Sequence, residues 1–232
     1  MIPHLIVGVI SDVHADSDRL NEVLNKISEY SPDSIIVAGD LTNKGSVEQV
    51  EDLLNEILGV SENTLFVFGN CDDPRLVDVI EELPGIGLHG SSFTIGEFEI
   101  CGIGGSTPTP FSTPFEISEE ELYLLGRASL NSVSRQSRVI LLTHDAPRMT
   151  SLDLSYRGHV GSEAVRRLYL ENSDRISLGI CGHIHESPGR DLIGNVEVFN
   201  PGAVIDGRYL VLEISQKDEK DVLIRIVDCP WI

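Results

Sequence analysis

The chain has 232 residues, of which 41% are hydrophobic and 23% are charged. This balance is typical of a folded globular protein and excludes a disordered chain or a fibrous repeat. The formal net charge of −20 argues against binding to nucleic acid or to an anionic membrane surface, because such binding requires clustered lysine and arginine. A small phosphate-containing ligand remains compatible with this charge if metal ions supply the positive charge.

Targeting and cysteine patterns point to the cytoplasm. The first apolar run, residues 5–10, is too short to span a membrane and lacks the basic leader of a signal peptide. The cysteines are widely spaced, without a Cys-x-x-Cys pair, so they indicate neither a zinc knuckle nor a thioredoxin-like site. They stand at Cys71, Cys101, Cys181 and Cys229. We therefore expect a cytoplasmic protein.

The first third of the chain alternates apolar runs with helical patterns. Continuous apolar runs at 5–10, 34–38 and 64–68 predict strands that are buried on both faces. Between them, residues 18–30 and 46–58 carry apolar side chains at helical spacing. This β-α-β-α-β order predicts a parallel sheet with crossover helices.

The rest of the chain predicts further strands, two helices and C-terminal hairpins. A Gly/Ser/Thr/Pro-rich loop, GGSTPTPFSTPFE, precedes a helix that starts near Ser118, with Glu121 as a capping-box partner, and a second helix is expected at 162–171. The predicted strands are 93–95, 98–103, 139–142 and 177–181, followed by hairpin strands at 191–193, 197–199, 209–214 and 222–227. With no repeat and no long linker, we expect residues 1–232 to form a single domain.

Polar side chains follow the ends of several predicted strands. Because the ends of neighbouring parallel strands lie together, these side chains can converge on one crevice. A mixture of carboxylate, amide and imidazole groups is typical of a divalent metal site that needs no thiolate. The residues are Asp12, His14, Asp40, Asn70, His144, His183 and His185.

Each motif by itself also has a structural explanation. A His-x-His pair is often a surface or core coincidence, Gly-Asp after a strand is a common turn, and Asn70 alone could cap a helix. Their order at the ends of successive strands favours the metal site.

These motifs resemble those of the calcineurin-like metallophosphoesterase superfamily. The matching stretches are SDVHAD, GDLTN, GNCDD, LTHDAP and CGHIHE, followed by NPGA, within residues 11–202. The resemblance implies an α/β fold, a four-layer αββα sandwich with two mixed β-sheets, and two metal ions at the C-terminal ends of the strands. One ion would take Asp12, His14, Asp40 and His185. The other would take Asp40, Asn70, His144 and His183, with Asp40 bridging. Manganese is the preferred metal, with iron, zinc or nickel as alternatives.

The resemblance implies hydrolysis of a phosphate ester, with a metal-bridging hydroxide that attacks phosphorus. This sequence departs from the family pattern at two positions: Cys71 replaces a histidine and Asn43 replaces an aspartate. In phosphatase branches that histidine, oriented by that aspartate, is thought to protonate the leaving oxygen. A subgroup of small archaeal and bacterial phosphodiesterases shares both changes, as does the retromer subunit. We therefore favour a phosphodiesterase acting on a small or nucleotide-like substrate over a monoesterase, with monoesters that have good leaving groups as an alternative. For Cys71 we favour a packing role over a role as the acid.

Two further residues are candidates for contact with the substrate, besides Asn70. His159, in RGHVGSE, could reach the substrate as a replacement proton donor, and Ser162 could hold a phosphate oxygen at the start of a helix. The structural alternatives are a surface loop residue for His159 and a helix N-cap for Ser162. The GGSTPTPFSTPFE loop could form a wall over the site, or simply connect a sheet to a helix.

Two other functions compete with the phosphodiesterase. A scaffold that binds a partner protein would have no physical reason to keep seven buried polar ligands together. A metal-dependent nuclease would need a basic strip beside the site, from Arg148, Arg157, Arg166 and Arg167. The natural substrate and the oligomeric state are not determined by the sequence, which is compatible with a homo-oligomer.

Overall fold

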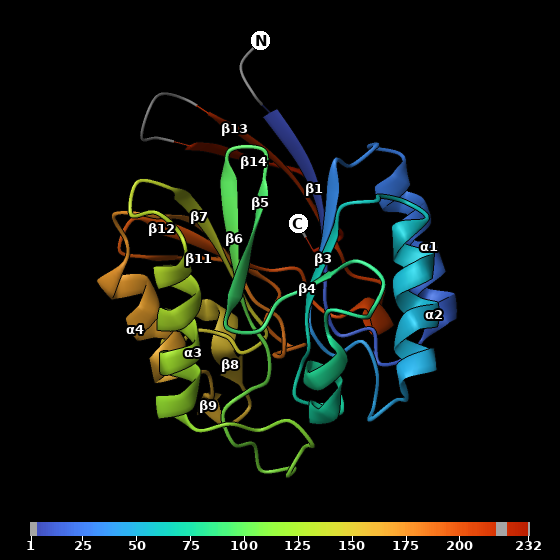
Figure 1. Cartoon of the computed structure of the whole chain (residues 1–232), viewed down its shortest axis with the longest axis horizontal. Helices are drawn as coiled ribbons and strands as arrows, with labels where there is room; N and C mark the ends of the chain where they lie inside the picture. The colour runs from blue at the N-terminus through green and yellow to red at the C-terminus, as the bar shows by residue number, and fades with distance from the viewer. Residues whose placement is uncertain (1–3, 217–221, 232) are drawn as a thin grey trace.

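Two mixed sheets face each other at the centre of the computed structural model, which describes residues 4–216 and 222–231 (Figure 1). The first sheet has the order β14-β13-β1-β2-β3-β4, and the second has the order β11-β12-β10-β7-β6-β5. The first comprises β1 (His4–Ile10), β2 (Ser34–Ala38), β3 (Thr64–Val67), β4 (Ile86–Gly87), β13 (Leu210–Gln216) and β14 (Val222–Asp228). The second comprises β5 (Ser91–Ile95), β6 (Phe98–Ile103), β7 (Arg138–Thr143), β10 (Ile176–Ile180), β11 (Gly189–Ile193) and β12 (Val196–Asn200).

Helices cover the outer face of each sheet (Figure 1). On the first sheet lie α1 (Ser17–Ser28) and α2 (Val47–Leu58), and on the second lie α3 (Glu119–Ser132) and α4 (Glu163–Glu171). Short 3₁₀ helices at Pro74–Val79, Ser151–Asp153 and Val204–Asp206 and a small hairpin of β8 (Leu154–Ser155) and β9 (Gly158–His159) complete the described elements. The predicted four-layer αββα sandwich is therefore confirmed.

The alternation of side chains along each strand builds the three apolar layers. In β2, Ile35 and Val37 pack with the helices, whereas Ile36 and Ala38 pack between the two sheets. Successive side chains of a strand point to opposite faces, so both sets are buried at once. This is the physical reason why the strands read as continuous apolar runs.

The helices begin where their caps place them. Ser46 and Gln49 form a capping box, in which the Ser46 hydroxyl accepts from the Gln49 amide at 3.4 Å and the Gln49 side chain accepts from the Ser46 amide at 3.2 Å. Ser118 caps α3 through the Glu121 amide at 3.1 Å. The capping box expected there is only half formed, since the described contacts of Glu121 include no return hydrogen bond from its side chain.

The C-terminal third differs from the expected series of hairpins. β11 and β12 do form an antiparallel pair, but β12 also pairs in parallel with β10. The chain then crosses to the other sheet, where β13 pairs antiparallel with β1, for example Leu212 opposite Val7. The turn that joins β13 to β14 lies outside the described residues. The strand β4 and the β8–β9 hairpin were not predicted, because segments of two residues carry no periodic signal.

The parallel strands β1, β2, β3, β7 and β10 place their carboxyl ends at one end of the sandwich, where the green loop 104–118 and the β8–β9 hairpin also lie (Figure 1). A main-chain hydrogen bond joins the two sheets there, since Gly105 after β6 donates to Phe68 after β3 at 2.8 Å. Within residues 4–216 and 222–231, no helix is long and apolar enough to cross a membrane.

The layer between the sheets makes a direct prediction about stability. Leu142 is fully buried in this layer, whereas Leu192 on the edge strand β11 is 58% exposed. We expect Leu142→Ala to lower the free energy of unfolding by about 2–5 kcal/mol, through lost burial and the cavity left behind. The matched Leu192→Ala should change it by less than about 0.5 kcal/mol. Urea denaturation measures both, and equal losses would contradict this assignment of the layers.

Candidate metal centre

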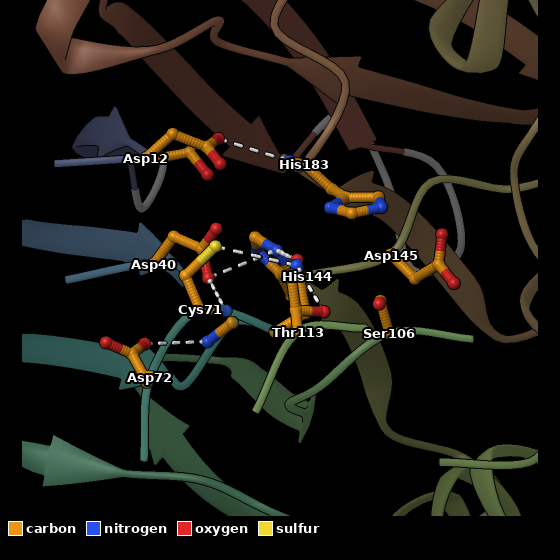
Figure 2. A network of polar contacts seen from close by, with 12 residues as sticks. Asp12, Asp40, Cys71, Asp72, Ser106, Thr113, His144, Asp145 and His183 are labelled. Carbon is orange, nitrogen blue, oxygen red and sulfur yellow. Dashed lines mark hydrogen bonds and ion pairs between the residues drawn. The ribbon is translucent and has the colours of Figure 1, made fainter. Parts of the chain in front are cut away.

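The structure brings the seven predicted ligands together from both sheets. Asp12 and His14 follow β1, Asp40 follows β2, and Asn70 follows β3 in the first sheet. His144 follows β7, and His183 and His185 follow β10 in the second. Figure 2 shows the side chains of Asp12 and Asp40 across from those of His144 and His183.

The first group of ligand atoms comes from Asp12, His14 and His185. Nε2 of His185 lies 3.1 Å from Oδ1 of Asp12 and 3.3 Å from Nε2 of His14. Nε2 of His14 lies 3.9 Å from the same Asp12 oxygen. Two atoms that bind one cation at about 2.1 Å lie roughly 3–3.5 Å apart. The three side chains are therefore spaced to share one ion after small adjustments.

The second group lies around His144. Its Nε2 is 2.8 Å from Oδ1 of Asn70 and 3.5 Å from Oδ1 of Asp40. The His183 ring lies beside it, with 5.0 Å between the ring centroids. An imidazole, an amide oxygen and a carboxylate oxygen thus face one another at the spacing of a second ion.

Asp40 belongs to both groups. Its Oδ1 faces His144, whereas its Oδ2 lies 3.7 Å from Nε2 of His14. One carboxylate can therefore serve two cations, as expected of a bridging ligand. The residue is 2% exposed, so both oxygens depend on protein atoms or ions rather than on bulk water.

The charges of these residues and their unsatisfied ligand atoms are suited to binding cations. Among the described residues, Oδ1 of Asp12 is buried and accepts no well-aligned hydrogen bond, although Nε2 of the candidate ligand His185 lies 3.1 Å away. This arrangement is costly unless an ion satisfies the oxygen. Burial, reinforced by the neighbouring His144, lowers the pKa of His183 to about 3, so this imidazole is neutral and available as a ligand at pH 7. Although burial alone would lower it, the carboxylates of Asp40 and Asp12 raise the pKa of His144. The two carboxylates therefore favour positive charge beside them, whereas His183 offers a neutral ligand nitrogen.

Partners outside the ligand set fix how two ligands point. Nδ1 of His144 lies 2.7 Å from the Ala38 carbonyl, and Nδ1 of His14 lies 2.8 Å from Oδ1 of Asn43. Both acceptors require hydrogen on Nδ1, which leaves Nε2 of each ring free to bind a metal. Asn43 thus has a positioning role that its identity in the sequence did not reveal.

The Asn70 amide is oriented by the loop 104–118. Its Nδ2 donates to Oγ1 of Thr113 at 3.0 Å, so Oδ1 is the atom that faces His144. Thr113 in turn is held by Glu116, which accepts from the Thr113 amide at 2.8 Å and from its hydroxyl at 2.7 Å. With its amide group engaged in this way, Asn70 is placed as a ligand more directly than as a substrate donor.

The backbone around the ligands is strained. Asp12, His14, Asp40 and His183 have φ values of 58°, 49°, 51° and 69°. Residues with a Cβ atom rarely adopt this left-handed region, and each costs about 1 kcal/mol or more. Hydrogen bonds hold the conformation: the Asp12 amide donates to Gly39 at 3.0 Å and the His14 amide donates to Asp40 at 2.9 Å. Strain of this kind, maintained by surrounding contacts, is typical of functional sites.

Two glycines allow the ligands to approach. A Cβ atom on Gly69 would lie 2.0 Å from Oδ1 of Asp40, and one on Gly39 would lie 2.3 Å from Nδ1 of His144. Any larger residue would displace a ligand, which explains the glycine before Asp40 and the glycine before Asn70.

Cys71 faces the site but holds its proton. Its sulfur lies in one group with His14 and Asp40, and its amide donates to Oδ1 of Asp40 at 2.7 Å. Burial and the Asp40 carboxylate raise the pKa of the Cys71 thiol well above its ordinary range. A thiol that releases its proton so reluctantly is a poor acid catalyst near neutral pH.

The structure does not support a substrate role for Ser162. The residue is fully buried at the start of α4, where its hydroxyl accepts from the Val165 amide at 3.1 Å and donates to Glu119 at 2.6 Å. The hydroxyl thus donates its proton to Glu119 and accepts the hydrogen bond that caps the helix. Ser162 is therefore the helix N-cap, which was the structural alternative for this residue.

His159 lies on the wall of a cavity beside the metal ligands. This cavity, of about 320 Å³, is also lined by His183, Phe111 and Glu186, and these three residues line the cavity over the metal ligands as well. The two cavities are therefore contiguous. Residues 107–111 of the Gly/Ser/Thr/Pro-rich loop form one wall of the first cavity, so this loop is more than a connection.

The four arginines considered for a nucleic-acid strip do not form one. Arg148 and Arg157 line the cavity. Arg166 donates to the main-chain carbonyls of residues 148 and 149, and Arg167 pairs with Glu171 on the exposed side of α4. Arg148 is itself paired with Glu163 at 3.2 Å. This arrangement offers no continuous positive track for a phosphate backbone.

Fold and site together define an αββα sandwich with a cluster of aspartate and histidine side chains, spaced to hold metal ions, at its strand ends. Residues 5–187 match the family model described as calcineurin-like phosphoesterase, and the chain belongs to this family, whose members are generally metal-dependent hydrolases. Uncharacterized protein MJ1162 of Methanocaldococcus jannaschii is 32% identical over 207 residues, which is 87% of this chain and 89% of that protein.

Solved structures share the fold at lower identity. TT1561 of Thermus thermophilus is 16% identical, covers 97% of this chain and 100% of its own, and has a TM-score of 0.72. The phosphopantetheinyl hydrolase of Mycobacterium tuberculosis is 13% identical, with 97% of each chain covered and a TM-score of 0.60. A dimetal phosphatase from Danio rerio is 12% identical, with 97% and 99% covered and a TM-score of 0.58.

Loss of the Asp40 carboxylate should weaken binding at both ligand groups. In protein loaded with Mn²⁺ we expect the parent to hold two ions per chain and Asp40→Asn to hold less than one, because both groups lose a charged ligand. The matched control is Asp52→Asn on the exposed face of α2, which should retain both ions. Mass spectrometry of metal content after dialysis measures this. Two ions retained by Asp40→Asn would contradict the bridging assignment.

The hydrogen bond between Thr113 and Asn70 should affect metal affinity at the His144 group more than at the other group. Thr113→Val preserves the shape but removes the acceptor that orients Asn70, so we expect affinity at the His144 group to fall by roughly 10- to 100-fold. Thr94→Val, on the exposed strand β5, is the control. Isothermal titration with Mn²⁺ separates the two binding steps, and an unchanged second step would show that Thr113 does not orient the ligand.

Proposed function

We propose that this protein is a phosphodiesterase that hydrolyses a small, nucleotide-like diester with two divalent metal ions. Asp12, His14, Asp40 and His185 would hold one ion; Asp40, Asn70, His144 and His183 would hold the other. Bound there, the ions would supply Lewis-acid charge for phosphoryl oxygens and activate water at neutral pH. Manganese is the metal we propose, with iron, zinc or nickel as alternatives that the same nitrogen and oxygen ligands accept.

The negative charge around the cavity over the ligands is the observation on which we base the preference for a diester over a monoester as substrate. Among the described residues, its lining includes the carboxylate of Glu186 but no lysine or arginine. A phosphomonoester carries a charge of about −1.5 to −2 near pH 7, whereas a diester carries one negative charge. In a chain of net charge −20, the less charged ester is bound at a lower electrostatic cost.

The neighbouring cavity offers room for an organic ester group. Its walls include Phe111, Pro108, Pro110 and Tyr156, and Arg148 lines the same space. Flat apolar walls with a guanidinium nearby suit an aromatic base or a similar ring. A diester could therefore place its phosphate over the metal ligands and one substituent in this cavity.

The remaining residues of the site supply positioning rather than a nucleophile. Thr113 and Asn43 hold Asn70 and His14 in their ligating orientations. The polar side chains that line the cavity over the ligands are either candidate ligands, Thr113, Glu186 or the protonated thiol of Cys71. Attack by water fits this composition better than a covalent intermediate on the protein.

An assay with matched substrates tests the proposal. After removal of metals with a chelator, we expect no hydrolysis of bis(p-nitrophenyl) phosphate, and recovery on addition of Mn²⁺. With Mn²⁺, kcat/KM for this diester should exceed that for p-nitrophenyl phosphate by at least about 10-fold, a difference of about 1.4 kcal/mol. Asp40→Asn should be inactive and Asp52→Asn fully active.

Two results would redirect the proposal. Faster hydrolysis of the monoester would replace the diesterase with a monoesterase. A purified protein that contains no metal and remains inert with added Mn²⁺ would favour the scaffold that binds a partner protein.

A further inference from the structure

We propose that His159, positioned by Asp153, donates the proton that the leaving oxygen of the ester requires. This inference rests on the proposed function and assigns the acid of that reaction to a residue outside the metal ligands.

Asp153 holds the His159 ring from a rigid base. Nδ1 of His159 lies 2.7 Å from Oδ1 of Asp153, which is fully buried. The carboxylate also accepts main-chain hydrogen bonds: from Thr150 at 2.9 Å, from Gly161 at 3.1 Å and from Met149 at 3.2 Å. An aspartate fixed at this many points cannot follow the ring, so the ring must adopt the orientation that the aspartate imposes.

The other ring nitrogen is free. Because Nδ1 contacts Asp153, Nε2 lies on the opposite edge of the ring, and in the part of the chain that the structure describes it has no protein hydrogen-bond partner. The His159 side chain is 32% exposed and lines the cavity that His183 also lines. A proton on Nε2 is thus available to a molecule that occupies the cavity beside the metal ligands.

The imidazole of His159 suits this proton transfer better than the guanidinium groups and the candidate ligand histidine that line the same cavity. Arg148 and Arg157 retain their protons at all relevant pH values, and His183 is committed as a ligand. Cys71 lies away from this wall, in the cavity over the metal ligands, where its sulfur is grouped with His14 and Asp40. Imidazole is the side chain whose ordinary titration falls near neutral pH, and a carboxylate behind it compensates the charge of its protonated form.

The proposed step conserves atoms and charge. An oxygen from water forms a bond to phosphorus while the bond from phosphorus to the leaving oxygen breaks, and the electron pair of that bond remains on the leaving oxygen. The Nε2 proton of the imidazolium moves to this oxygen and produces the alcohol. The neutral ring then recovers a proton from solvent, which balances the proton that water lost.

The dependence on leaving group provides the test. Thymidine 5′-monophosphate p-nitrophenyl ester releases a stable phenolate that needs no proton, whereas a dinucleoside phosphate releases an alkoxide that does. We expect His159→Ala to lower kcat for the dinucleoside phosphate by roughly 100-fold or more and kcat for the p-nitrophenyl ester by less than about 5-fold, since only the first reaction needs the acid. Asp153→Asn should shift the same ratio in the same direction. His4→Ala, at the exposed start of β1, is the matched control and should leave both rates unchanged.

Two further readouts separate catalysis from folding and metal loading. His159→Ala should retain the metal content and the thermal unfolding midpoint of the parent. Nitrogen NMR of the metal-free protein should show hydrogen on Nδ1 of His159, and Asp153→Asn should alter this tautomer preference. If Asp153→Asn does not fold, His159→Ala and His159→Gln decide the matter by themselves.

The outcomes distinguish the inference from the function on which it rests. If the parent protein hydrolyses neither substrate with any metal, the proposed function fails. If the parent is active but His159→Ala loses both reactions equally, or neither, the function stands and the acid role of His159 is refuted.

Discussion

The structure depends on one buried carboxylate that faces two ways. The two oxygens of Asp40 point at different histidines, one from each half of the chain. To hold it there, the backbone of Asp40 adopts a left-handed conformation, and Gly69 leaves the space that the carboxylate occupies. These features cost free energy in a protein without ions. They make physical sense together if cations compensate the carboxylate.

The sandwich positions the site because the candidate ligands come from the strand ends of both sheets, where the two sheets meet. Asp12, Asp40 and Asn70 follow strands of the first sheet, whereas His144 and His183 follow strands of the second. The apolar layer between the sheets sets the distance between these two sets of side chains, and the hydrogen bond from His144 to the Ala38 carbonyl fixes it locally. Packing of the core and geometry of the ligands are thus parts of one constraint, since interiors pack too densely for a sheet to shift independently.

A strongly acidic protein can bind an anion if the positive charge is local. The net charge of −20 is distributed over the chain, but the two carboxylates of the site favour positive charge beside them, as the raised pKa of His144 indicates. The loop 104–118 connects the cavity lined by His159 to the candidate ligands, since Thr113 contacts Asn70 while residues 107–111 line that cavity. The β8–β9 hairpin contributes His159 to the lining of the same cavity.

The sequence by itself determined the features that depend on near neighbours. Apolar periodicity located most strands and helices, as for Ile35 to Ala38 in β2, and the motifs at the strand ends identified the candidate ligands that the structure brings together. The tertiary structure alone decided the contacts that join distant segments. These contacts include the hydrogen bonds of Asn43 with His14 and of Thr113 with Asn70. They also include the pairing of β13 with β1 and the buried hydrogen bond from Ser162 to Glu119. The physical reason is the distance along the sequence between the interacting residues. Periodicity reflects burial of one face over a few residues. The partner of a side chain that lies 29 or 43 residues away depends instead on the path of loops that carry no repeating pattern.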